Sequence, residues 1–273
     1  MGRFSRLETG QPGHGGEDPD DPLGSCRIDH AYPRAPGDEA GENLTVEICL
    51  AKGAEAMFRG ESKPALRWYG RAIDIDAAAT EPWVGMLRVL LLTGNLAEAG
   101  TWVHRGLTLF PDLPELLAMR AVMLARRGMV RDAMALTDAL LERNSNLALV
   151  HVARGEVLAL AGGRGWERCL RQGLELVPGD DWATPLWITL ILRERRLDAR
   201  ALQYALKAQE RNPHSPTIWM VIGQCHGRLG RRSQARKALA RARELCEPDD
   251  ILLARIDRVE PGSILRRLLC LFR

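Results

Sequence analysis

The sequence predicts an all-α protein built from stacked pairs of helices. Past Thr45, apolar residues recur at three- and four-residue spacing, as on one face of a helix, and Pro or Gly interrupts them at short intervals. No segment alternates apolar and polar residues in the way a half-buried strand does. One phrase also occurs twice, because RGLTLFP at 105–111 returns as QGLELVP at 172–178.

Two series of mostly small residues give the length of the repeating unit. Both recur at intervals of 33 to 35 residues. Small residues let two helices approach closely, and a single helix pair cannot bury its apolar face alone, so stacked units must supply the core. The first series is Ala65, Ala99, Ala133, Trp166, Ala201 and Ala235, and the second is Ala72, Gly106, Leu140, Gly173, Ala208 and Ala242.

A unit of about 34 residues with two helices resembles the tetratricopeptide repeat. In that repeat the first helix carries an aromatic residue, Leu-Gly and a second aromatic residue, and the second helix carries Ala, an aromatic residue and a closing Pro. The resemblance implies a right-handed α-solenoid of about six helix-turn-helix units with a C-terminal capping helix. The sixth unit matches the pattern best, at Trp219, Ile222, Gly223, His226, Ala235, Leu239 and Pro248.

The other units carry the pattern in part. The fourth departs furthest, because GGRG at 162–165 replaces the usual turn and the bulky Trp166 falls at or beside the position of a small residue. Taken in chain order, the remaining matches are Gly53, Ala65 and Tyr69; Trp83, Ala99 and Pro111; Leu117, Ala133 and Thr137; His151 and Gly155; and Pro185, Ala201 and Pro213.

The two ends differ in composition from the repeats. Residues 1–45 hold eight Gly, five Pro and nine acids against four Arg, without apolar periodicity, so we expect a disordered acidic tail. The solenoid with its capping helix is expected over residues 46–260. Residues 261–273 form a short basic amphipathic segment, which is expected to finish the solenoid or, alternatively, to touch a membrane surface.

No motif in the sequence indicates catalysis, a cofactor or a metal. The AGGRG stretch lacks the Lys-Ser/Thr of a phosphate-binding loop, and Cys225-His226 lacks the partners of a haem or zinc site. The six His residues form no constellation with a nucleophile and an acid. Six scattered Cys read as free thiols, and no signal peptide opens the chain, so we expect a cytoplasmic, bacterial-type, non-enzymatic protein.

The resemblance also implies where a partner would bind. In this family the first helix of each unit lines a concave groove that holds the ligand. The lining expected here is largely apolar, which suits an extended or helical segment of another protein and no small-molecule substrate. The expected groove residues are Val84, Arg88, Leu91, Val122, Arg126, Val152, Glu156, Leu186, Leu190, Arg193, Met220, Gln224 and Arg228.

The sequence therefore favours a protein-binding adaptor, chaperone or assembly factor that holds an apolar or amphipathic partner segment in this groove. A second interpretation stays open. Residues 191–273 carry eighteen Lys and Arg against nine acids, with a basic run at 228–243. This end indicates, as the alternative, a factor associated with a membrane surface or a nucleic acid, whose affinity would fall steeply as salt rises.

Overall fold

The computed structural model describes residues 44–143, 146–246, 253 and 256. Helices alone make up the regular structure of this part of the chain, and consecutive helices pack in pairs, which confirms the predicted all-α solenoid of six helix-turn-helix units. In order, the units are α1 (Val46–Arg59) with α2 (Ser62–Ile75), α3 (Glu81–Thr93) with α4 (Leu96–Leu109), α5 (Pro114–Arg126) with α6 (Val130–Arg143), α7 (Ala148–Leu160) with α8 (Trp166–Glu175), α9 (Ala183–Glu194) with α10 (Asp198–Arg211), and α11 (Pro216–Arg228) with α12 (Arg232–Glu244).

Most of the predicted tail and end segments lie outside the described residues. This holds for residues 1–43, for the C-terminal segment 261–273 and for the capping helix at 249–260 except Leu253 and Ile256. Ile256 is fully buried in the main apolar cluster. The end of the solenoid is therefore covered at this position.

The turn inside each unit recurs with a strict period along the chain. A residue with a left-handed backbone ends the first helix of every unit, and the next residue donates its N–H to a carbonyl five positions earlier, over 2.9 to 3.0 Å. This Schellman motif satisfies helix carbonyls that would otherwise lack hydrogen-bond partners. The six left-handed residues stand 34 positions apart, at Gly60, Gly94, Gly128, Gly162, Arg196 and Gly230.

The fourth unit departs from the others after its left-handed residue. Helix α8 begins four residues after Gly162, whereas every other second helix begins two residues after the corresponding position. Helix α8 therefore begins at the small-residue position itself, since Gly155 approaches the Trp166 carbonyl and Leu170 just as Gly223 approaches the Ala235 carbonyl and Leu239. Trp166, the first residue of α8, thus occupies its predicted place in that series, where its half-buried side chain replaces a small one.

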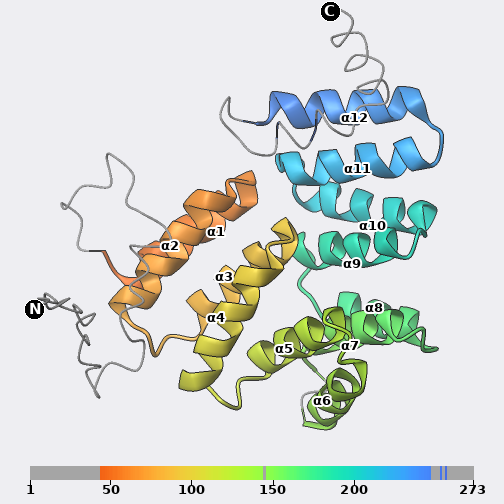
Figure 1. Cartoon of the computed structure of the whole chain (residues 1–273). Helices are drawn as coiled ribbons and strands as arrows, with labels where there is room; N and C mark the ends of the chain where they lie inside the picture. The colour runs from red at the N-terminus through yellow and green to blue at the C-terminus, as the bar shows by residue number, and fades with distance from the viewer. Residues whose placement is uncertain (1–43, 144–145, 247–252, 254–255, 257–273) are drawn as a thin grey trace, which may run out of the picture.

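The solenoid folds back on itself. Units one and two (α1 to α4) form one arm, units five and six (α9 to α12) form a second arm, and α5 to α8 connect them (Figure 1). Helix α3 contacts α9, although the two belong to the second and fifth units. At the end of the arms, the Asn212 amide in the α10–α11 turn donates a hydrogen bond of 2.6 Å to the Phe58 carbonyl oxygen in α1.

Burial shows which helices lie inside. Each of α3, α5, α7, α9 and α11 buries at least seven residues, whereas α4, α6, α8, α10 and α12 each bury only three or four. In units two to six the first helices therefore form the inner layer and the second helices the outer layer. The first unit differs, because α1 buries four residues and α2 buries six. No helix in the described part of the chain has the length and apolar character needed to span a bilayer.

Arg196 gives a direct test of the turn series. A side chain in the left-handed region costs about 1 kcal/mol relative to Gly, partly offset by the greater freedom of Gly in the unfolded chain. Because Arg196 is exposed at φ 60°, we expect Arg196→Gly to raise the free energy of unfolding by about 0.5 kcal/mol. The reciprocal control, Gly128→Arg, should lower it, because it puts a side chain on a left-handed backbone at φ 86°; no atom crowds that position, so backbone strain alone acts. Urea unfolding followed by circular dichroism measures both, and a loss of stability in Arg196→Gly would contradict this account.

Candidate functional site: the inner surface

All thirteen expected groove residues lie on first helices, but the fold exposes them unequally. Six of them have no open groove to face, because the two arms close on each other and bury their side chains in the core. Their role as partner contacts stays a prediction, and in this closed arrangement a partner does not reach them. The six are Leu91, Val122, Val152, Glu156, Leu186 and Met220.

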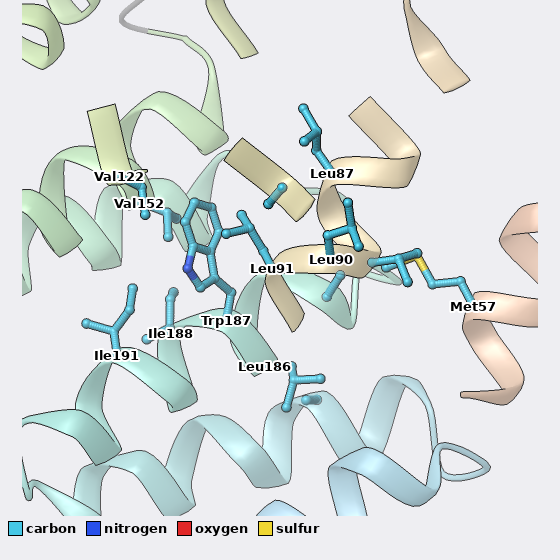
Figure 2. Packing of buried hydrophobic residues seen from close by; sticks show 14 of the residues in the cluster. Met57, Leu87, Leu90, Leu91, Val122, Val152, Leu186, Trp187, Ile188 and Ile191 are labelled. Atoms are coloured by element: carbon cyan, nitrogen blue, oxygen red, sulfur yellow. The ribbon is translucent and has the colours of Figure 1, made fainter. Parts of the chain in front are cut away.

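The indole of Trp187 occupies the centre of the inner surface. It projects from α9 among Leu91 of α3, Val122 of α5 and Val152 of α7 (Figure 2). Only 6% of Trp187 is exposed. Trp187 is not among the predicted groove residues, yet its ring fills the space where a groove between the arms would otherwise run.

A buried ion pair lies beside this indole. Arg126 donates from Nε to Glu156 Oε1 over 2.5 Å, and its Nη2 lies at the same distance from that oxygen. The Trp187 Nε1–H donates to the other carboxylate oxygen, Glu156 Oε2, over 2.8 Å. Burial raises the pKa of the Glu156 carboxyl above its ordinary value, and the Arg126 guanidinium opposes that rise. Glu156 thus ties three successive first helices, α5, α7 and α9, together.

A small cavity lies at the seam between the arms. Its volume is about 30 Å³, and its walls include Arg88 and Leu91 of α3 and Thr184 and Trp187 of α9. That space suits one or two water molecules rather than a ligand. Arg88 Nη1 lies 3.9 Å from Asp181 Oδ1, just before α9, so a long-range ion pair joins the second and fifth units here.

The accessible part of the predicted groove lies on α9 and α11. Leu190, Arg193 and Gln224 are half-buried and Arg228 is exposed. Arg228 Nη1 donates to the Arg193 carbonyl oxygen over 3.0 Å and lies 3.3 Å from Asp198 Oδ1. Within the described residues, Arg193 Nε and Gln224 Oε1 are buried without a hydrogen-bond partner. An unsatisfied donor and an unsatisfied acceptor thus lie just beneath this part of the surface.

The remaining expected residue, Val84, is half-buried on α3. A different surface is strongly charged, because the outer side of α12 presents basic side chains with few acids. Glu244 is the acid that offsets one of them, 2.9 Å from Arg241 Nη1. The exposed basic residues of this α12 basic face are Arg231, Arg232, Arg236, Lys237 and Arg241.

Three of the four described cysteines, Cys49, Cys169 and Cys225, are buried. Cys49, Cys169, Cys225 and Cys246 are free thiols. Burial raises the pKa of the Cys225 thiol to about 11, so it is protonated at neutral pH and a poor nucleophile. Among the residues that the structure describes, no group of His, Cys, Asp and Glu side chains is arranged to hold a metal ion.

The buried ion pair generates a stability prediction. Glu156→Leu should lower the free energy of unfolding by about 3 kcal/mol, because it removes the buried carboxylate from Arg126 and leaves that charge only Glu194, at 3.9 Å. Glu55→Leu is the matched control, since it breaks the exposed Arg59–Glu55 pair and should cost less than about 1 kcal/mol. Denaturant unfolding of both variants checks this, and equal losses would contradict a central role for Glu156.

Comparisons with known proteins describe the fold. No protein-family model and no curated protein matches the chain at a significant level. A tetratricopeptide repeat protein from Parabacteroides merdae is similar in structure, with a TM-score of 0.50 and 15% identity over 82% of this chain and 86% of that one. A chain of the APC/C hetero-tetramer Cut9-Hcn1 (TM-score 0.48, 13% identity, 78% of this chain) and yeast Tom70 (0.47, 15%, 82%) also match, but this chain spans only 42% and 48% of their lengths. With six stacked helix pairs, the chain has the α-solenoid fold of tetratricopeptide repeat proteins.

Proposed function

We propose that this protein is a non-enzymatic scaffold that binds a segment of another protein on the α9–α11 part of its inner surface. One observation carries the proposal. Arg193 Nε and Gln224 Oε1 are two buried polar atoms that have no hydrogen-bond partner in the described residues, and Leu190 on the same helix as Arg193 is half-buried. Buried polar groups are nearly always hydrogen-bonded, so an unused donor and an unused acceptor favour a ligand that supplies both.

A polypeptide segment has the matching chemistry. Its backbone offers a carbonyl to the Arg193 guanidinium and an N–H to the Gln224 side-chain oxygen, and its apolar side chains can pack against Leu190. An extended or helical segment of apolar or amphipathic character fits this surface better than a highly charged one. The scaffold would thus serve as an adaptor, chaperone or assembly factor in the cytoplasm.

The α12 basic face favours a second candidate function. Four exposed basic side chains on α12, with Arg231 directly before it, attract an anionic surface such as a membrane or a nucleic acid. Contacts of this kind depend on many screened charges, and their affinity falls steeply with salt. The two functions therefore differ in their salt dependence and in the residues that they need.

Selection from a displayed peptide library with the full chain, followed by fluorescence anisotropy of a selected peptide, tests the first function. Leu190→Glu should weaken binding at least about tenfold, because a carboxylate facing an apolar side chain loses solvation without gaining a partner. Arg236→Glu with Lys237→Glu is the matched control and should leave the affinity unchanged. Circular dichroism confirms helicity in each variant.

The opposite pattern would reject the proposal. If Leu190→Glu binds the peptide normally while the double variant on the α12 basic face fails, the inner surface is not the binding site. Strong weakening of binding between low and high salt would point the same way, toward the anionic partner.

A further inference from the structure

The two arms meet at their ends through a buried side chain. The amide of Asn212, at the end of α10, donates to the carbonyl oxygen of Phe58, over 2.6 Å and 154 positions along the chain. Asn212 is fully buried, and its Oδ1 accepts a hydrogen bond from the His214 backbone N–H over 3.2 Å. The Phe58 carbonyl belongs to the last turn of α1, where helix carbonyls lack partners within the helix. Asn212, in the turn between the fifth and sixth units, therefore supplies a hydrogen-bond donor to a carbonyl at the end of α1 in the first unit.

A close backbone approach supports the same contact. A Cβ placed on Gly60 would lie 2.7 Å from Pro216 Cδ, which is shorter than real contacts allow. The other glycines with a left-handed backbone have no atom within 4 Å of such a Cβ. Among the left-handed glycines of the described chain, Gly60 alone is thus pressed against another unit. The ring of Phe58 also lies 6.5 Å from that of His214, and Phe58 remains 37% exposed.

This turn-to-turn contact differs in kind from the contacts between neighbouring units. Neighbouring units share long helix seams, whereas the two turns meet through one hydrogen bond, one close approach and one partly exposed ring pair. In a solenoid, small rotations at each of several unit interfaces add up to a large displacement of the ends. The ends of the arms are therefore able to separate while every unit keeps its own helix pairs.

We propose that the contact among Phe58, Gly60, Asn212 and Pro216 is a latch that holds the arms closed over the inner surface. While it is closed, Leu91, Leu186, Trp187 and Met220 stay buried between the arms or at their seams. Opening it separates α1 and α3 from α9 and α11 and exposes apolar side chains. The use of this opening in partner binding rests on the proposed function, whereas the latch itself does not.

The test compares two glycines at equivalent turns in the full chain. Gly60→Ala and Gly94→Ala both put a Cβ on a left-handed backbone, but only Gly60→Ala must displace Pro216. Hydrogen exchange read by mass spectrometry should show amides of α3 and α9 exchanging about tenfold faster in Gly60→Ala than in Gly94→Ala, because opening removes their mutual protection. The apolar dye ANS should bind Gly60→Ala more strongly than Gly94→Ala. Asn212→Ala removes the hydrogen bond without a clash and should shift both readings in the same direction.

The same measurements can overturn the latch. If Gly60→Ala and Asn212→Ala match Gly94→Ala in exchange across α3 and α9 and in dye binding, the turns do not hold the arms closed. Should Gly60→Ala fail to fold, hydrogen exchange and ANS binding of Asn212→Ala alone decide the question. A peptide that binds the wild-type chain and an opened variant equally would reject the link to partner binding while leaving the latch itself standing.

Discussion

The contact between α3 and α9 through the interior of the solenoid determines most of what distinguishes this molecule. A solenoid ordinarily gains its stability from contacts between adjacent units alone. Here Trp187 reaches from the fifth unit to Leu91 of the second, and Arg88 lies beside Asp181 across the same seam. The two arms consequently share one apolar cluster. The concave surface becomes an interior, and the accessible binding surface is reduced to the α9–α11 portion.

The buried Glu156 carboxylate orients the Trp187 ring in this interior. Glu156 accepts hydrogen bonds from Arg126 and from Trp187, so the ring that contacts the opposite arm is oriented by an ion pair between α5 and α7. Purely apolar packing would permit several ring positions of similar free energy. A buried carboxylate that needs both donors permits few, since each lost hydrogen bond leaves a desolvated charge. The hydrogen bonds of Glu156 therefore fix the orientation of the Trp187 ring that contacts the opposite arm.

Local features were predictable from the sequence, and the curvature was not. The spacing of Ala65, Ala99 and Ala133 identified the helix pairs, because close helix approach requires small residues wherever the chain repeats. The glycine series beginning at Gly60 was present with a stricter period and, although Arg196 interrupts it, would have located the turn in five of the six units. The burial of Leu186 and Met220 depends instead on small rotations between units that add over the whole chain. Arg126 and Glu156 were named separately for the same reason, since only the stacked units bring them together.

The closeness of the arms is the central claim, and nuclear Overhauser contacts test it most directly. With Leu methyl groups labelled in the full chain, cross-peaks between Leu91 of α3 and the indole protons of Trp187 of α9 report on the contact, because both side chains line the same small cavity. The account predicts strong cross-peaks between them. If Leu91 shows cross-peaks only to residues of its own and neighbouring units while the helices remain intact, the arms are apart in solution and the closed inner surface is wrong.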